Sequence, residues 1–458
     1  MFFLLALMTG CGTDEPDYIV PAVSAVSVIE AVDTTLVYDS YEGEEAKPEA
    51  AIQVYSSEDG LCVIERKPSY YEVWLHHDKG DPYAVGCAYA ETIMKLTLDY
   101  AAVLEPYLYE NIDSAFPNLD GDYTPVIERI YKLMEQIPED YVQEMKGFAG
   151  TLSGGMKGME SDGYLSYEEV LLAQMVPDCV RGTNCSALCV WGEKTTTGER
   201  IVSRTLDWPQ GSEYQMCTAQ AVTHFVMGEG KNSYTTFSVL GMLDMLTGLS
   251  DKDVFAGILD AGSCYAYECE GKKCYSYELR YALENMPDAR SIGEYMVSES
   301  KNFTYSHNVI ITDKNDCFVA EDCVYDGEEV TGQSILRDSA TPLMDDISWD
   351  NPDSLCVVNA FLAEGADDHL TANGSNYVRF CKYNEWTAEK AKLSVADVKS
   401  IVTRESTSRL PGYQAIYSYL TYHVIIYDYA TGQLDVCFTG TEGVTDHPTF
   451  TRIEKTLR

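Results

Sequence analysis

Residues 184–208 constrain the fold of this chain more than any other segment. An apolar run at 185–191 is followed by a stretch rich in threonine and glycine, and then by a second strand-like run at 201–208. This order predicts a β-hairpin. Because opposite positions of an antiparallel pair have a constant sum of residue numbers, a turn centred near residues 195–197 places Cys185 opposite the segment 204–208.

The predicted hairpin brings three reactive side chains to one end: the thiol of Cys185, the guanidinium of Arg204 and the carboxylate of Asp207. A permanent cation beside a thiol lowers the thiol pKa from about 8.5 toward neutrality, which makes the sulfur a better nucleophile at neutral pH. Arg204 and Asp207 are three residues apart, so in an extended strand their side chains point to opposite faces of the sheet. One of them must therefore reach along the strand or around an irregularity to join the others.

Cleavage of the peptide bond between Asn184 and Cys185 would add a general base to this group. The freed α-amine has a reference pKa of about 7.7 to 8.0 and would lie within reach of its own sulfur. Asp207 could then hold the ammonium form. The hairpin alone leaves a second interpretation open, in which Cys185 is one of fifteen cysteines and serves as a small apolar residue in a buried strand.

In its details the hairpin resembles the nucleophile hairpin of the N-terminal-nucleophile (Ntn) hydrolases related to choloylglycine hydrolase. It is more similar to the peptidase C45 acyltransferase and hydrolase branch, which includes isopenicillin N acyltransferase and acid-ceramidase-like enzymes. The residues that carry the resemblance are Cys185-Ser186-Ala187, Trp191-Gly192, Gly198, Arg204 and Asp207-Trp208. The chain departs from the family pattern at Ser203 and Thr205, where the family has GRN around the arginine.

Further segments in the family's order extend the resemblance over roughly residues 72–455. They lie at 76–93, 136–152, 166–175, 277–296, 304–322, 355–365 and 375–383. The apolar spacing of the fourth segment predicts two amphipathic helices, and the fifth predicts a hairpin that turns at residues 313–316. The resemblance implies that Asn308 helps to bind the oxyanion, and that Asn359 and Arg379 line the pocket.

One departure concerns the expected oxyanion site. Where the family commonly has GMNExG, with an asparagine lining the active site, this chain has TGLSDKD and therefore Ser250. A serine hydroxyl can donate one hydrogen bond, but it is shorter than an asparagine amide. Losing one such donor typically slows a reaction by about 10²-fold or more, so the substitution predicts an altered substrate preference or a weak enzyme.

The resemblance also implies the fold. Residues 185–458 are expected to form an α+β Ntn-hydrolase domain, a four-layer αββα sandwich with two antiparallel sheets. Residues 56–184 are expected to form a helical region that stays packed on the sandwich after cleavage. Residues 12–55 are rich in acidic residues, Pro, Ser and Thr, which predicts a tether.

Residues 1–11 resemble a bacterial lipoprotein signal in which Cys11 is lipidated after cleavage. An uncleaved signal and a chance apolar terminus are the other interpretations, because no positive charge precedes the apolar run and Met8 stands where leucine is usual. No later segment offers the about 20 uninterrupted apolar residues needed to span a bilayer. The sequence thus predicts an exported protein, held at the cell envelope by a lipid anchor only.

The charge balance disfavours a nucleic-acid partner. The chain has 32 basic and 73 acidic residues, a net charge of −41, which repels phosphates and anionic lipid surfaces. The acidic residues are spread along the chain, as expected for a solvated exported surface. Fifteen cysteines also suit an exported protein, and the even spacing of Cys264, Cys269 and Cys274 matches no zinc motif, so disulfides or buried thiols are expected there.

The resemblance implies a hydrolase that cleaves a small-molecule amide through a thioester on Cys185, with no metal or organic cofactor. Two other functions stay open. An acyltransferase would pass the same thioester to an amine, and the sequence cannot separate the two because they differ only in the acceptor. A catalytically silent, surface-binding lipoprotein on the same fold is the second. A Cys/His protease would need a histidine beside Cys185, and nothing in the sequence selects one.

Overall fold

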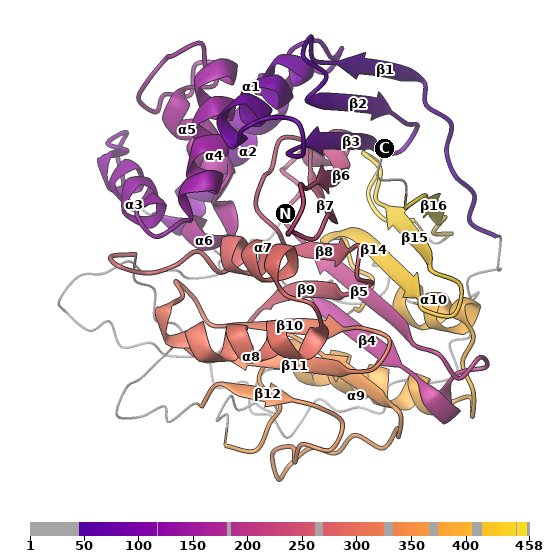
Figure 1. The fold of residues 1–458 in the computed structure, drawn as a ribbon. Helices are drawn as coiled ribbons and strands as arrows, with labels where there is room; N and C mark the ends of the chain where they lie inside the picture. The colour runs from indigo at the N-terminus through magenta and orange to yellow at the C-terminus, as the bar shows by residue number, and fades with distance from the viewer. Residues whose placement is uncertain are drawn as a thin grey trace, which may run out of the picture.

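The structure, a computed structural model, describes residues 45–116, 118–180, 185–261, 269–324, 333–365, 374–404, 415–445 and 447–455. The predicted signal with Cys11, most of the predicted tether, and Asn184 lie outside the described residues. The described residues form an α+β protein with two β-sheets, as predicted (Figure 1). Helices contact strands of both sheets.

The larger sheet has ten strands. In spatial order they are β1 (Gln53–Ser56), β2 (Cys62–Arg66), β3 (Tyr71–His76), β6 (Gln220–Val226), β7 (Tyr234–Val239), β8 (Thr247–Ser250), β9 (Phe255–Asp260), β10 (His307–Thr312), β11 (Cys317–Asp322) and β12 (Ile335–Arg337). The predicted hairpin with a turn at residues 313–316 is confirmed by the pairing of β10 with β11.

The smaller sheet has six strands and contains the predicted hairpin of residues 184–208. In spatial order its strands are β13 (Ser354–Val357), β4 (Ser186–Val190), β5 (Ile201–Asp207), β14 (Thr421–Asp428), β15 (Gln433–Phe438) and β16 (Thr451–Ile453). Strands β4 and β5 pair with Ala187 opposite Arg204 and Cys189 opposite Val202. Ser186 pairs with Thr205, and the same register continued by one residue places Cys185 opposite Leu206. This position lies within the predicted segment 204–208.

The helices form two groups. Those before Cys185 are α1 (Pro82–Ile93), α2 (Tyr100–Ala115), α3 (Thr124–Met134), α4 (Glu139–Leu152), α5 (Tyr167–Ala173) and α6 (Val176–Val180); those after it are α7 (Tyr275–Asn285), α8 (Ala289–Glu299), α9 (Gly374–Ala388) and α10 (Val395–Thr403). Helix α8 packs on β10 and β11 of the larger sheet, whereas α9 and α10 pack on β13, β5 and β14 of the smaller one. The predicted helix pair at 277–296 is confirmed by α7 and α8.

Two expectations differ from the structure. Both sheets were expected to be antiparallel, but β3 and β6 pair in parallel, with Tyr71 opposite Ala221. A parallel pair needs a long crossover connection, and the helices α1–α6 between these strands belong to it. The region expected to be helical therefore begins with strands. The aromatic and branched residues of β3 are buried along the whole strand, as in the centre of a sheet.

The last part of the predicted tether belongs to the fold. Lys47 forms a bridge with Thr451, the side chain of Ala46 is buried, and β1 pairs with β2. The Glu49 carboxylate also accepts hydrogen bonds from Ser69 and Thr451. Residues 45–55 are thus held by backbone pairing and by an acidic side chain, although their composition is that of a linker.

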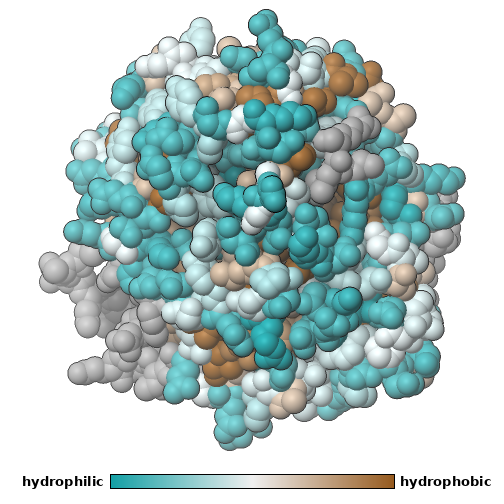
Figure 2. All heavy atoms as spheres, in the orientation of Figure 1, coloured by the Kyte–Doolittle hydropathy of each residue, from teal (hydrophilic) through white to brown (hydrophobic). Residues whose placement is uncertain are grey.

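The face of the molecule seen in Figure 2 is mostly hydrophilic, and its apolar side chains lie in small separate patches. This surface fits the strongly acidic composition. Among the helices that the structure describes, none combines the length and the apolar character required to cross a bilayer.

Helices α1 and α4 cross at two glycines. A Cβ atom on Gly86 would lie 2.1 Å from the carbonyl oxygen of Glu144, and one on Gly147 would lie 2.2 Å from the carbonyl oxygen of Tyr83. Both distances are far shorter than any van der Waals contact, so the two backbones approach this closely only because both side chains are absent. Gly150 lies on the same helix α4, but a Cβ there would meet nothing within 4 Å.

We expect Gly147→Ala to lower the free energy of unfolding by about 1 to 3 kcal/mol, because the new methyl group must push the two helices apart. Gly150→Ala is the matched control and should raise it by about 0.5 to 1 kcal/mol through its better helix propensity. Urea unfolding of both variants and the parent chain measures the difference. Equal effects at the two positions would contradict the close crossing.

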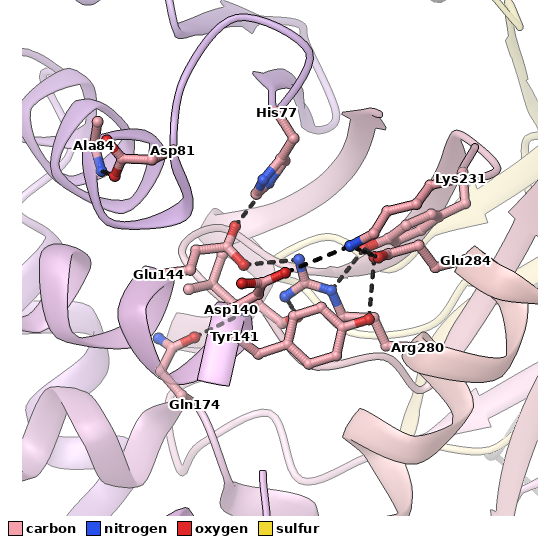
Figure 3. Close-up of polar contacts among 12 residues, drawn as sticks. His77, Asp81, Ala84, Asp140, Tyr141, Glu144, Gln174, Lys231, Arg280 and Glu284 are labelled. Carbon is pink, nitrogen blue, oxygen red and sulfur yellow. Dashed lines mark hydrogen bonds and ion pairs between the residues drawn. The ribbon is translucent and has the colours of Figure 1, made fainter. Parts of the chain in front are cut away.

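A buried ionic cluster joins the helices before Cys185 to the strands and helices after it (Figure 3). Glu144 on α4 lies 3.0 Å from the ring nitrogen Nε2 of His77 and 2.7 Å from Nη2 of Arg280 on α7. Burial alone would raise the pKa of Glu144, but the charges of Arg280 and His77 hold it below its usual value. Arg280 also donates to Tyr234 and is packed over the Tyr141 ring.

We expect Arg280→Met to lower the free energy of unfolding by about 3 to 5 kcal/mol, since it leaves Glu144 buried without its strongest partner. The control is Lys392→Met, which removes a cation from an exposed pair with Glu193 and should change stability by less than about 1 kcal/mol. Chemical denaturation measures both. A loss at Arg280 as small as that at Lys392 would show that the cluster does not stabilise the fold.

Candidate active site

Cys185 directly precedes β4, and its side chain is only 1% exposed. Its sulfur lies 3.6 Å from Nη2 of Arg204 and 3.8 Å from the backbone oxygen of Asp207. The hairpin register explains this arrangement, because Ser186 pairs with Thr205 and the thiol therefore lies beside the end of β5. The structure thus brings together the sulfur and the arginine that the sequence indicated. A cation at this distance stabilises a thiolate by Coulombic attraction.

The guanidinium of Arg204 is buried between the two sheets. Its Nη2 donates to the carbonyl oxygen of Ile258 on β9 at 2.7 Å, so it bridges the sheets. Gly257 makes room for it, since a Cβ there would come within 3.2 Å of Cγ of Arg204. Among the described residues Nε and Nη1 of Arg204 have no hydrogen-bond partner. Two buried donors are therefore available beside the sulfur.

Asp207 approaches the site from the other face of β5, because it lies three residues after Arg204 in an extended strand. Its Oδ1 accepts a hydrogen bond from Thr421 at 2.7 Å, while Oδ2 has no partner within the described part of the chain. Burial raises the pKa of Asp207 to about 7, although Arg379, Thr421 and Arg204 oppose the shift. The partner strand β14 is irregular beside Asp207, because its register with β5 shifts between Thr421 and His423.

Arg379 on α9 holds the backbone of Cys185. Its Nη1 donates to the backbone oxygen of Cys185 at 2.8 Å, and its Nη2 donates to Oδ1 of Asn359 at 2.9 Å and to Asn376. Asn359 in turn donates to the backbone oxygen of Asp260 at 2.7 Å. Of the two residues expected in the pocket, Arg379 therefore lies beside Cys185 and Asn359 lies beside Arg379, and together they connect α9, the backbone of Cys185 and the end of β9.

Asn308 has a different environment from the one that the resemblance implied. Its Nδ2 donates to the carbonyl oxygens of Val358 and Ala360, both at 3.0 Å. An asparagine amide has only two N–H donors, so neither is available for an oxyanion in this arrangement. Asn308 instead supports the backbone on both sides of Asn359.

Ser250 is engaged at the opposite end of the β8–β9 hairpin. Its hydroxyl accepts hydrogen bonds from the amides of Lys252 and Val254, each at 3.3 Å. Strand β9 reaches the site eight residues later, at Ile258, which accepts from Arg204. The structure therefore gives Ser250 a role in the turn and does not bring it to Cys185.

Three residues of the site were missed by sequence reasoning: Thr421, Asn376 and His423. His423 is opposite Leu206 on β14, and burial and the charge of Arg204 lower its pKa well below the usual value. Strand β5 lies between β14 and β4, the strand that follows Cys185, which disfavours a Cys/His pair. Asn376 precedes Arg379 by three residues on one helix face, and this spacing was the one available signal. No sequence pattern indicated Thr421 or His423, because their positions beside β5 depend on the irregular pairing of β14.

Within the described ranges no three His, Cys, Asp or Glu side chains gather in a way that would hold a metal ion. A cavity of about 660 Å³ lies away from the sulfur, at the edges of β12 and β13, and is lined among others by Arg337, Trp349, Cys356 and Phe380. The side chain of Cys185 is buried and does not line it. This cavity therefore does not reach the sulfur of Cys185.

Comparison with known proteins gives similarity at the level of structure. No family model matches the chain, and neither does any curated protein sequence. Similar solved structures include a Caenorhabditis elegans ortholog of N-acylethanolamine-hydrolyzing acid amidase, with 15% identity over 53% of this chain and 92% of that one, at a TM-score of 0.37. A variant of conjugated bile acid hydrolase from Clostridium perfringens has 12% identity, coverages of 60% and 98%, and a TM-score of 0.34. Penicillin V acylase from Agrobacterium tumefaciens has 12% identity, coverages of 60% and 87%, and a TM-score of 0.34.

The raised pKa of Asp207 predicts a pH-dependent stability. Because the pKa is about 7 in the folded chain against an ordinary value of 3.8, the carboxyl contributes fully below about pH 4, and this contribution is lost as the pH rises to about 7. Asp207→Asn removes the titration. The unfolding free energy of the Asn variant minus that of the parent should therefore grow with pH, by at most about 1.4 kcal/mol per unit, and level off above pH 7.

Both chains should carry Cys185→Ala, so that the chemistry of the thiol cannot differ between them. Denaturation at about pH 4, 5, 6, 7 and 8 gives the difference directly. A constant difference over this range would mean that Asp207 is not a buried carboxyl with a raised pKa.

Proposed function

We propose that this protein is an amide hydrolase of the Ntn type that activates itself by cleaving the peptide bond before Cys185. The single observation that carries the proposal is the 3.6 Å contact between the sulfur of Cys185 and the buried guanidinium of Arg204. A thiol that serves only to fill space gains nothing from a permanent cation, and burying that cation is costly unless an anion pairs with it. A thiolate on Cys185 would pair with the guanidinium of Arg204.

In the first stage the sulfur attacks the carbonyl carbon of Asn184. The acyl group moves from nitrogen to sulfur, and water then hydrolyses the thioester, which leaves a carboxylate on Asn184 and a free α-amine on Cys185. The 1% exposure of the Cys185 side chain supports this order of events. A nucleophile that is buried in the intact chain meets an external substrate only after its surroundings open.

In the second stage the sulfur attacks a substrate amide and the new α-amine carries the proton to the leaving amine. Asp207 is suited to hold the α-ammonium, because its Oδ2 is buried beside the nucleophile strand and without a partner among the described residues. The ammonium would also favour the ionised form of the Asp207 carboxyl, whose pKa burial raises to about 7 in the uncleaved chain. Water completes the cycle by hydrolysing the thioester.

Oxyanion stabilisation needs a donor other than Asn308 as it lies here. The unpartnered Nε and Nη1 of Arg204 are buried next to the sulfur and meet the requirement for prearranged donors in a site without water. Arg379 then positions the nucleophile through the backbone oxygen of Cys185. This arrangement assigns Arg204 two tasks, stabilising first the thiolate and then the charge that develops on the substrate.

A catalytically silent binding protein on the same fold is the alternative. Two observations favour it. The amide of Asn308 is engaged by backbone oxygens, and Ser250 lies in the β8–β9 turn away from Cys185, so neither residue is available to bind an oxyanion. Self-cleavage separates the two functions, because a silent protein has no reason to break its own chain.

Mass spectrometry of the purified chain after incubation at about pH 5 to 8 tests the proposal. We expect a fragment that begins with Cys185 in the parent, none in Cys185→Ala, and cleavage slowed by about 10²-fold or more in Arg204→Met. Lys392→Met should cleave like the parent, because its exposed ion pair with Glu193 is not part of the site. An intact parent chain that unfolds cooperatively would overturn the proposal and favour the silent alternative.

A further inference from the structure

The cavity at the edges of β12 and β13 is separate from the candidate active site, and its size suits a small organic molecule. Its volume of about 660 Å³ lies within the range of about 300 to 1,000 Å³ that is usual for ligand pockets. Residues of β12, of β13, of the segment 338–353 between them, and Phe380 of α9 line it.

One side of the cavity is aromatic and is held in place. The indole N–H of Trp349 donates to Oγ of Ser354 at 3.0 Å, and Ser354 donates to the backbone oxygen of Asn351 at 2.8 Å. The Trp349 ring also contacts the ring of Phe380, with 5.7 Å between the ring centroids. Because the indole is already fixed, a ligand that packs on it loses little affinity to the ordering of this side chain.

Three carboxylates also line the cavity, and their surroundings fix each of them. Each accepts hydrogen bonds through a single oxygen, and the other oxygen has no protein partner within the described ranges. The bonds join Asp338 to the Thr341 hydroxyl at 2.9 Å, Asp350 to the Asn384 amide at 3.2 Å, and Asp353 to the backbone N–H of Glu193 at 2.8 Å.

The negative charge of these carboxylates is not compensated by a protein cation. Among the residues that the structure describes, no lysine or arginine forms an ion pair with Asp338, Asp350 or Asp353. Arg337 lines the same cavity, but it is paired with Glu321 at 2.6 Å and adds no net charge. The cavity therefore favours a positively charged ligand over an anion of the same shape.

The ring of Trp349 lacks a cation as well. The guanidinium groups of Arg200 and Arg404 lie over the rings of Trp191 and Trp386, each 4.8 Å from the ring centroid. In the described part of the chain no lysine or arginine lies over Trp349 in this way. The face of an indole attracts cations, most strongly where water is excluded. The aromatic side and the carboxylates thus favour the same class of ligand.

The spacing of the carboxylates disfavours a metal ion. No three acidic side chains of the described residues lie close enough together to hold one. We infer that the cavity binds an organic ammonium ion with an apolar body. The body packs on Trp349 and Phe380, and the ammonium group lies toward Asp350 and Asp353. The net charge of −41 raises the concentration of such cations near the molecule.

Calorimetric titration of the full chain tests the inference. The chain carries Cys185→Ala, so that no covalent chemistry contributes, and is titrated at two temperatures with phenethylamine, 2-phenylethanol and phenylacetate, which share a ring and differ in charge. We expect the amine to bind about tenfold or more tightly than the alcohol, and phenylacetate not to bind. The affinity for the amine should fall as NaCl rises from about 0.05 to 0.5 M.

Variants locate the binding site. Asp350→Asn combined with Asp353→Asn should weaken amine binding by about threefold to tenfold, while the amide oxygens still accept the two hydrogen bonds. Trp349→Leu should weaken it further, because the ring face is lost. Asp345→Asn is the matched control, since it removes an exposed carboxylate of the same segment that does not line the cavity. It should change the affinity by less than about twofold.

Four results would overturn the inference. The first is no binding of phenethylamine up to about 10 mM. The second is equal affinity for the three probes, and the third is binding of methyl β-glucoside without binding of the amine, which would indicate a sugar site. The fourth is an equal loss in Asp345→Asn and in the double variant. All titrations use Cys185→Ala and require no cleavage, so this inference and the proposed function fail independently.

Discussion

The buried guanidinium of Arg204 is the interaction on which the candidate site depends. It reaches from β5 across the space between the sheets to the backbone oxygen of Ile258, and it contacts the sulfur of Cys185 on the way. A permanent cation in such a place is destabilising unless anions or dipoles surround it. The absence of a side chain at Gly257 and the register of the β4–β5 hairpin are the two features that admit it. The position of the sulfur beside Arg204 and the end of β5 follows from that register.

Several residues of the candidate site have buried polar atoms without partners. Nε and Nη1 of Arg204, Oδ2 of Asp207, Oδ1 of Asn308 and both ring nitrogens of His423 lack a hydrogen-bond partner among the described residues. Folded proteins rarely leave such groups unsatisfied, so a concentration of them is typical of a site that awaits a ligand or a chemical change. An α-ammonium and a polarised carbonyl oxygen would satisfy the anionic and the cationic members respectively. The proposed chemistry would thus satisfy the unpartnered atoms of Arg204 and Asp207.

The sequence was informative where the structure is local. The turn between β4 and β5 fixes their pairing, and the period of the apolar residues marks α7 and α8. It contained no signal for contacts between segments that are far apart in the chain. The parallel pairing of β3 with β6 spans the whole helical region, and the donors of Asn308 are engaged by a backbone segment fifty residues away. Composition was also misleading for residues 45–55, because a few backbone pairs and one carboxylate can hold a polar stretch that could not form a core by itself.

The parallel pair of β3 and β6 has a consequence for the two pieces that cleavage before Cys185 would create. Strand β3 belongs to the first piece, yet it lies between β2 and β6, and β6 belongs to the second. After such a cleavage the larger sheet would contain strands of both polypeptides, whereas the smaller sheet would lie wholly in the second. Residues 185–458 produced alone would carry β6 as a bare edge, a row of unsatisfied amides and carbonyls that invites aggregation. In the cleaved protein, the residues before Cys185 would therefore still be needed to cover this edge.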